Sequence, residues 1–200
     1  VALAASTAFG TMLGLDDHPL YDAAGNLVNA EDPGDLEMGP IMGAPLVSLR
    51  DLWVNAADTS GSGNFQDDLA TITDITTNGI SFRVDDHRSD LAGATRISID
   101  TGTDRISGVI EMNDDVDLFR FSTLAANATI SVKGLDLRDL YASVTNPGTN
   151  LDPVLEILDG TGAVIETSDP PNVGGNPARL EPSISRNLPA GTYYLRVSNI

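Results

Sequence analysis

The hydrophobic pattern of the chain changes near Arg96. From that residue onward, apolar and polar residues alternate in short segments, which is the two-residue period of a half-buried strand. Turn sequences such as Asn113–Asp115, Asp159–Gly162 and Pro189–Gly191 separate the segments. The predicted strands are Ile106–Met112, Leu118–Ser122, Thr129–Lys133, Val154–Leu158, Ala163–Glu166, Leu180–Ser185 and Thr192–Ser198. Short strands joined by such turns are typical of an all-β antiparallel sandwich, of jelly-roll or immunoglobulin-like type.

The residues before Arg96 lack this alternation. Val1–Leu13 is Ala-rich and apolar almost all round, which predicts a buried helix, and Gly14 is placed to end it. The polar stretch Asp16–Met38 predicts an irregular loop. Four further elements are predicted, namely a turn at Pro40–Ala44, an apolar segment at Val47–Val54 with Trp53 in the core, a short amphipathic helix at Asn64–Ile72 and a strand at Ile80–Val84.

These patterns divide the chain into two domains. We predict a first domain over residues 1–87, a linker over residues 88–104 and a sandwich over residues 105–200. The apolar start has no basic residues and no initiator Met, so it does not have the form of a signal peptide. We expect Val1 to be a break within a longer chain, and we expect the last strand of the sandwich to be missing after Ile200.

Charge and composition exclude some classes of function. The chain has 29 acidic and 11 basic residues and a net charge of −18, which argues against nucleic acid as a partner. No apolar run is long enough to span a membrane. The absence of cysteine means that the fold uses no disulfide bonds, and it leaves export open.

The stretch Thr7–His18, TAFGTMLGLDDH, resembles the zinc-binding helix of metzincin proteases, H-E-x-x-H-x-x-G-x-x-H followed by a Met-turn. Gly10, Leu13, Gly14 and Leu15 coincide with the family pattern, and Met42 stands in the turn PIMGA. The ligand positions are Thr7, Thr11 and Asp17, and the general-base position is Ala8. Because threonine hydroxyls are poor zinc ligands and Ala8 cannot accept a proton, zinc is not expected here. His18 is one residue out of register, and we interpret it as an exposed loop histidine.

The resemblance continues beyond this helix. Secreted bacterial proteases of this type have a Trp after the Met-turn, then Q-D-D-L-A-x-I, then R-x-D-D-H. The corresponding residues are Trp53, Gln66–Ile72 and Arg83–His87. The resemblance implies an α+β remnant of a metzincin-like domain. Within it, we expect Asp67, Asp68, Asp85 and Asp86 to cap helices and form ion pairs.

The second half resembles the bacterial pre-peptidase C-terminal domain. The matching segments are Ser107–Ile110, Asp115–Phe121, Leu151–Gly162 and Leu188–Val197. That family is a non-catalytic β-sandwich attached to secreted proteases. The resemblance implies a module that is removed or used for targeting and substrate attachment.

Asp115 and Asp117 lie two residues apart, so on a strand their side chains share one face. Together with Asp114 they form a candidate calcium site, since calcium prefers carboxylate oxygens. The alternative is that these carboxylates accept hydrogen bonds from turn N–H groups. Calcium is the one cofactor that the residues indicate.

These features predict a fragment of a secreted or cell-surface bacterial protein related to metallopeptidases. The segment is expected to be non-catalytic and to serve targeting or binding through its sandwich, with an extracellular polymer or a cell-surface component as the partner. Two alternatives stay open. The chain is part of an active secreted zinc metalloendopeptidase whose ligands lie elsewhere, or it is a structural spacer of a large surface protein. The ligand of the sandwich and the oligomeric state are not indicated by the sequence.

Overall fold

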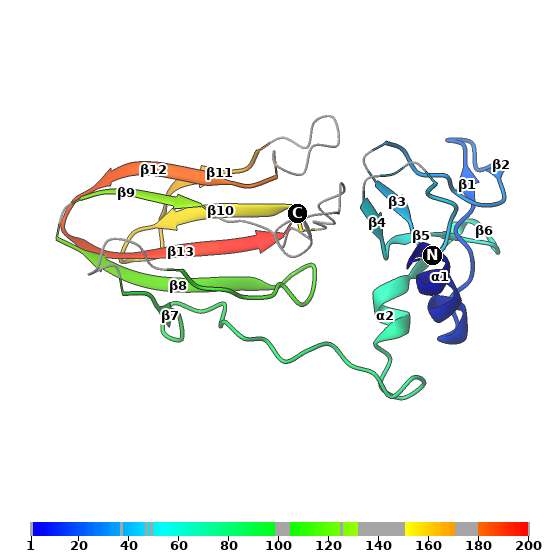
Figure 1. Ribbon diagram of the computed structural model, residues 1–200, viewed down its shortest axis with the longest axis horizontal. Coiled ribbons are helices and arrows are strands. Elements are labelled where there is room, and N and C mark those ends of the chain that lie inside the picture. Colours follow the sequence, from blue (N-terminus) through cyan, green and yellow to red (C-terminus); the bar gives the residue numbers. More distant parts are fainter. Residues whose placement is uncertain are drawn as a thin grey trace. The chain divides into compact units, whose positions relative to one another are not determined.

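The computed structural model describes residues 2–36, 38–46, 48, 50–98, 105–124, 126–131, 151–170 and 180–199. The described residues form two compact units that divide between Phe82 and Arg83 (Figure 1). We predicted this division after His87. No helix among the described residues is long and apolar enough to cross a membrane.

The N-terminal unit begins with helix α1, Ala2–Met12, as predicted. The helix ends where Gly14 adopts a positive φ of 91°. The Leu15 N–H donates to the Gly10 carbonyl at 3.1 Å and the Gly14 N–H donates to the Thr11 carbonyl at 3.1 Å, the two bonds of a Schellman motif. The prediction of a buried helix is wrong, since Phe9 is 46% exposed and Met12 is 83% exposed. Among the described residues, the face of α1 that carries Gly10 packs against Met42 and Trp53.

Short paired strands follow α1. The strands β1 (Leu20–Tyr21) and β2 (Leu27–Asn29) pair antiparallel within the predicted loop, β3 (Met38–Pro40) and β4 (Arg50–Leu52) pair parallel, and β5 (Asn55–Asp58) and β6 (Gly61–Asp67) pair antiparallel. The last helix of the unit is α2, Asp68–Ile72, which is shorter than predicted. The Asp67 carboxylate accepts a hydrogen bond from the Ala70 N–H at 3.0 Å and starts the helix there. The predicted strand Ile80–Val84 does not form.

The core of the N-terminal unit is small. It contains Leu15, Met42 and Ile72, with Leu13 and Trp53 packed against them. A Cβ atom at Gly10 would lie 2.6 Å from the Met42 sulfur and 3.1 Å from Trp53 Cζ3. Gly10 therefore lets α1 approach this core closely.

Gly10→Val is expected to destabilise the N-terminal unit by about 1–3 kcal/mol, because the added side chain overpacks the core beside Met42. Urea unfolding followed by the fluorescence of Trp53, the only tryptophan, measures this effect. Ala8→Val is the control, since Ala8 is exposed and the same β-branched residue enters the same helix. Ala8→Val is expected to lose only a few tenths of a kcal/mol, and Val has a higher helix propensity than Gly, so propensity alone would stabilise Gly10→Val. A Gly10→Val variant that is as stable as the wild type or more stable would show that the core accommodates the added side chain.

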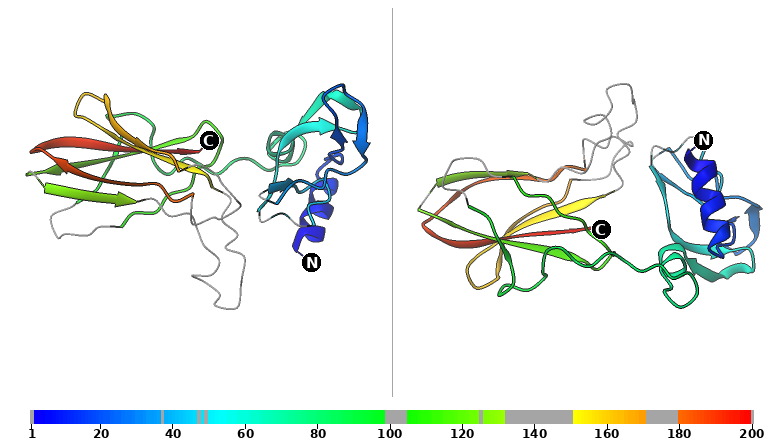
Figure 2. Two further views of the ribbon diagram at one scale, coloured as in Figure 1. Left: turned by 90° about the horizontal axis from the view of Figure 1, so that it is seen from above. Right: turned by 60° about the horizontal axis from the view of Figure 1, so that its bottom comes forward.

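The C-terminal unit consists of two sheets. One has the strand order β11-β10-β13-β8-β7, and the other pairs β12 with β9 (Figure 2). The strands are β7 (Thr95–Arg96), β8 (Val116–Thr123), β9 (Ala126–Ser131), β10 (Pro153–Leu158), β11 (Val164–Ser168), β12 (Ser183–Leu188) and β13 (Gly191–Asn199). Buried side chains from both sheets share one core, including Phe119, Phe121, Leu155, Ile184 and Leu195. This is the two-layer arrangement that the alternating pattern predicts.

Three features differ from the predicted sandwich. The sheet is mixed, because β7 pairs parallel with β8, in the register Thr95↔Phe119 and Arg96↔Arg120. The predicted strand Ile106–Met112 does not form. Residues that we predicted as linker instead pack on the sheet, where Leu91 and Ala94 cover Leu118 and Tyr194.

Candidate functional site

The four positions that correspond to the zinc ligands and the base lie on α1 and just after it. The Thr7 hydroxyl is within hydrogen-bond distance of the Leu3 and Ile41 carbonyls, at 3.1 and 2.9 Å. The Thr11 hydroxyl donates to the Thr7 carbonyl at 3.1 Å. Ala8 and Asp17 are exposed. The hydroxyl groups are therefore engaged with main-chain carbonyls, and α1 carries no side chain that could activate a water.

Met42 lies in a turn in which the Gly43 N–H donates to the Pro40 carbonyl at 3.0 Å. Its side chain is 1% exposed and belongs to the core beneath α1. The Met42 carbonyl accepts from the His18 N–H at 2.9 Å. The turn is thus tied to the segment that follows the helix.

His18 is fully buried, so the interpretation of an exposed loop histidine is wrong. Its Nε2 lies 2.9 Å from Oδ1 of Asp68, which is also fully buried, and its Nδ1 lies 3.0 Å from the Ala57 carbonyl. Asp68 also accepts from the Gln66 amide at 2.9 Å and from the Val54 N–H at 3.1 Å. The sequence carried no signal for this network, because its partners are up to 50 residues apart.

The partners of His18 determine its charge. Burial lowers the pKa of His18, but the hydrogen bond to Asp68, the bond to Ala57 and the charges of Asp68 and Asp32 outweigh it, so the pKa is raised above 6.5. The Ala57 carbonyl can only accept, and the carboxylate of Asp68 faces donors alone. A doubly protonated imidazolium satisfies both contacts, and His18 therefore joins distant segments of the N-terminal unit as a buried ion pair.

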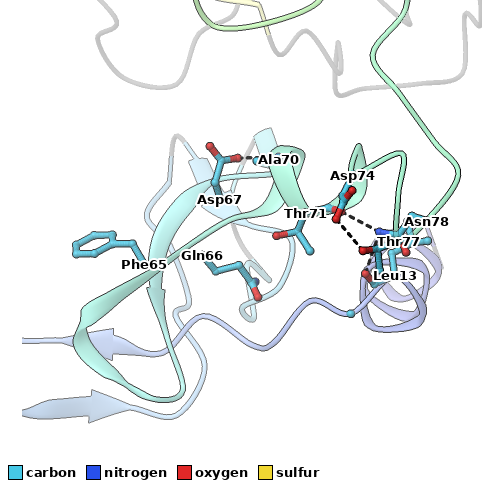
Figure 3. A pocket seen from close by; sticks show the side chains of 10 residues that line it. Leu13, Phe65, Gln66, Asp67, Ala70, Thr71, Asp74, Thr77 and Asn78 are labelled. Carbon is cyan, nitrogen blue, oxygen red and sulfur yellow. Dashed lines mark hydrogen bonds between the residues drawn. The ribbon is translucent and has the colours of Figure 1, made fainter.

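A pocket of about 590 Å³ opens on the N-terminal unit (Figure 3). It lies between the end of α1 at Leu13 and the residues around α2. Two of its polar side chains are engaged internally, since Asp67 caps α2, as predicted, and Asn78 donates to the Leu13 and Thr71 carbonyls. The hydroxyls of Thr76 and Thr77 hold the pKa of Asp74 at about 2. These groups support the local fold and do not form a nucleophile–base pair.

A cluster of acidic side chains lies in the C-terminal unit, and we call it the acidic cluster. Asp85 and Asp86 lie in the segment before β7, and Glu111 lies before the turn at Asn113–Asp115. The other members are Asp115, the residue before β8, and Asp117, at the start of β8. One carboxylate oxygen from each of Asp85, Asp115 and Asp117 lies within 4.8 Å of the others, and the same holds for Asp85, Asp86 and Glu111. Within the described residues, such groups of three occur only in this unit.

Several members of the acidic cluster are held by main-chain donors. Asp115 accepts from the Val116 N–H at 2.7 Å and from the Glu111 N–H at 3.0 Å. Asp85 accepts from the His87 N–H at 2.8 Å. Arg83 contacts Asp86 at 3.0 Å, which agrees with the predicted ion-pairing role. These bonds orient the carboxylates and leave further lone pairs available.

Two members carry buried oxygens with no hydrogen-bond partner, namely Oδ1 of Asp117 and both carboxylate oxygens of Glu111. Asp117 is 3% exposed and lies on the same face of β8 as the core residue Phe119. Burial, reinforced by the charges of Asp115, Asp86 and Glu111 and opposed by His87, raises the pKa of Asp117 to about 7. Burial and the neighbouring Asp115 raise the pKa of Glu111. The nearest cation to Glu111 is Arg83, whose Nε lies 3.9 Å from Oε1, beyond hydrogen-bond distance. Buried carboxylate oxygens without a hydrogen bond are costly, so this site favours a proton or a cation.

The donor set distinguishes between metals. His87 adjoins the acidic cluster, but its Nδ1 contacts the Thr95 hydroxyl at 2.9 Å and its Nε2 contacts the Ser107 carbonyl at 3.0 Å. Because a carbonyl only accepts, Nε2 carries a proton and is not free to bind a metal. The remaining donors are carboxylate oxygens, which suit calcium and not zinc.

The cluster differs from the calcium site that the sequence indicated. Asp115 and Asp117 lie together, whereas Asp114 is exposed and belongs to none of the groups. Asp85, Asp86 and Glu111 join them, and sequence reasoning assigned none of these to a metal. In the sequence, only the adjacent acids Asp85 and Asp86 could have indicated further metal ligands. They are far from Asp117 along the chain, so the sequence did not show that the three side chains lie close together in space.

We compared the chain with known proteins. A family model described as the bacterial pre-peptidase C-terminal domain matches residues 115–199. No curated protein and no solved structure matches the chain significantly. The matched range begins at Asp115, within the acidic cluster, and includes β8 to β13. The C-terminal unit therefore contains a bacterial pre-peptidase C-terminal domain over residues 115–199.

Proposed function

We propose that the chain belongs to a secreted modular protein related to bacterial metallopeptidases and that this segment is non-catalytic. Its C-terminal unit serves attachment to extracellular material, and calcium bound at the acidic cluster stabilises it. The family match carries this proposal, because pre-peptidase C-terminal domains occur in secreted peptidases as non-catalytic modules. The absence of a membrane-crossing helix among the described residues is compatible with it.

The N-terminal unit supports a degenerate metzincin-like origin. Two features support this part of the proposal: Met42 lies buried beneath α1, and Gly14 ends that helix. The side chains at the ligand positions Thr7 and Thr11 bond to main-chain carbonyls and not to one another. The zinc motif of metzincins requires two imidazole donors on one helical face, and α1 has none.

Protein purified without chelators is expected to contain well below one zinc per chain and to leave casein intact. Inductively coupled plasma mass spectrometry and a fluorescent casein assay test this, with Asp17→Ala as the variant at the remaining ligand position. Stoichiometric zinc that disappears in Asp17→Ala would contradict the assignment. It would favour the alternative of a working zinc metallopeptidase.

Attachment is tested by sedimentation of the full chain with insoluble extracellular material, such as bacterial cell walls or collagen fibres. The proposal expects the protein to co-sediment in calcium and to be released by chelator. A protein that stays in the supernatant on all such materials would favour the role of a structural spacer.

A further inference from the structure

Two arginines lie side by side on the outer face of the large sheet. Arg96 of β7 pairs in parallel register with Arg120 of β8, so both side chains leave the sheet in the same direction. Ser122 is two residues further along β8, and its register partner on β13 is Thr192. These four residues, with Phe121, line a hollow of about 230 Å³.

The arginines are not explained by ion pairing. Within the part of the chain that the structure describes, neither Arg96 nor Arg120 forms a salt bridge, whereas Arg186 contacts Glu166 at 2.7 Å and Arg196 pairs with Glu156. Like charges at paired positions of neighbouring strands repel each other. In a chain with 29 acidic residues, two adjacent cations that pair with none of the described carboxylates favour an anion from outside.

The side chains that surround the arginines suit such an anion. The hydroxyls of Ser122 and Thr192 lie 3.2 Å apart, and one of them donates to the other. The hydroxyl that accepts in this pair keeps its own proton for a ligand. Guanidinium groups bind oxyanions through two parallel N–H bonds. The hollow therefore presents two positively charged guanidinium groups and one hydroxyl donor on one exposed surface.

We propose that the hollow lined by Arg96, Arg120, Ser122 and Thr192 binds a single oxyanion group, a carboxylate or a sulfate, on an otherwise uncharged extracellular molecule. The net charge of −18 repels polyanions, so an isolated anionic group fits better than a densely charged polymer or nucleic acid. Arg120 and Asp117 of the acidic cluster both lie on β8, but Arg120 is exposed and Asp117 is buried on the face that carries Phe119. The anion site therefore does not depend on the calcium proposal.

Nuclear magnetic resonance of the full chain tests this proposal. The probes are N-acetylglycine, its neutral amide N-acetylglycinamide, and sodium sulfate at constant ionic strength. Saturable shifts of the Arg96 and Arg120 side-chain Nε–H signals are expected with N-acetylglycine or sulfate, and the two titrations show which oxyanion is preferred. The neutral amide is expected to bind at least about tenfold more weakly. Equal shifts with the acid and the amide, or no saturable shift with either anion, would overturn the proposal.

Arg96→Gln and Arg120→Gln are each expected to weaken binding on the order of tenfold. Arg186→Gln is the matched control, because it removes the same charge from the same unit at a paired position. Thermal unfolding of each variant checks the fold, and removal of one of two repelling charges is not expected to lower the midpoint. A loss of affinity in Arg186→Gln as large as in Arg96→Gln would show that overall charge, and not the hollow, attracts the anion.

Discussion

Millimolar calcium is expected to raise the unfolding temperature of the C-terminal unit. A ligand that binds only the folded state stabilises it by about 2.7 kcal/mol at a hundredfold excess over Kd, which corresponds to a shift on the order of 10 °C for a domain of this size. Calorimetry of the full chain with calcium and with chelator measures the shift. Trp53 fluorescence follows the N-terminal unit alone, and its transition is expected to stay in place.

Asp117→Asn is expected to abolish the calcium shift and to raise the midpoint in chelator, because it replaces a buried, unpartnered carboxylate with a neutral amide. Asp114→Asn is the control, since it makes the same charge change in the neighbouring turn at an exposed position outside the acidic cluster. A calcium shift that persists in Asp117→Asn and disappears in Asp114→Asn would place the ion at the turn and not in the cluster.

The calcium effect is also expected to depend on pH. The pKa of Asp117 is raised from 3.8 to about 7, so the folded state holds its proton more tightly than the unfolded state does. The stability from this group is therefore fully present below about pH 4 and is lost as the pH rises through 7. Calcium competes with the proton, and its shift is expected to be larger at pH 8 than at pH 5.5. Equal shifts at both pH values would mean that the ion binds without Asp117.

The second large effect is expected in the N-terminal unit. His18→Ala or Asp68→Ala removes one partner of a fully buried pair, which costs about 3–5 kcal/mol because the other partner stays buried without compensation. Urea unfolding monitored by Trp53 measures this loss. Asp17→Asn, an exposed change one residue away, is the control and is expected to have little effect. If His18→Ala unfolds at the same urea concentration as the wild type, the pair contributes nothing to stability.

The same pair determines a pH dependence. The pKa of His18 is raised in the folded state, so its contribution to stability is fully present below pH 6.5 and is lost as the pH rises through the folded pKa. The carboxylates that act on it are Asp68 and Asp32. The wild-type N-terminal unit is expected to lose stability as the pH rises above 6.5, and His18→Gln is expected to show a flatter profile. A wild-type profile as flat as that of the variant would mean that His18 is neutral in the fold.

The strands of the C-terminal unit could be predicted because their signals are local. Alternation along β8, β10 and β13 and the turn at Asp159–Gly162 need only neighbouring residues, and a two-residue period shows which side chains face the core. The end of α1 at Gly14 is local in the same way. The prediction of a strand at Ile106–Met112 failed, because the local alternation there is weak and the segment does not pair with another strand.

What the tertiary structure decided involves residues far apart in the chain. From the sequence, His18 was interpreted as a loop residue, but in the fold its ring hydrogen-bonds to Asp68 and to the Ala57 carbonyl. A buried polar group is stable only with such partners. β7 joins the sheet in parallel, a pairing that requires a long connection, and the chain between Arg96 and β8 is long enough to provide one. The sequence by itself determined most strand segments of the C-terminal unit, the helix stop and the acidic pair Asp115 and Asp117. Only the fold brought Asp85, Asp86 and Glu111 to that pair, because burial and charge act through space and not along the chain.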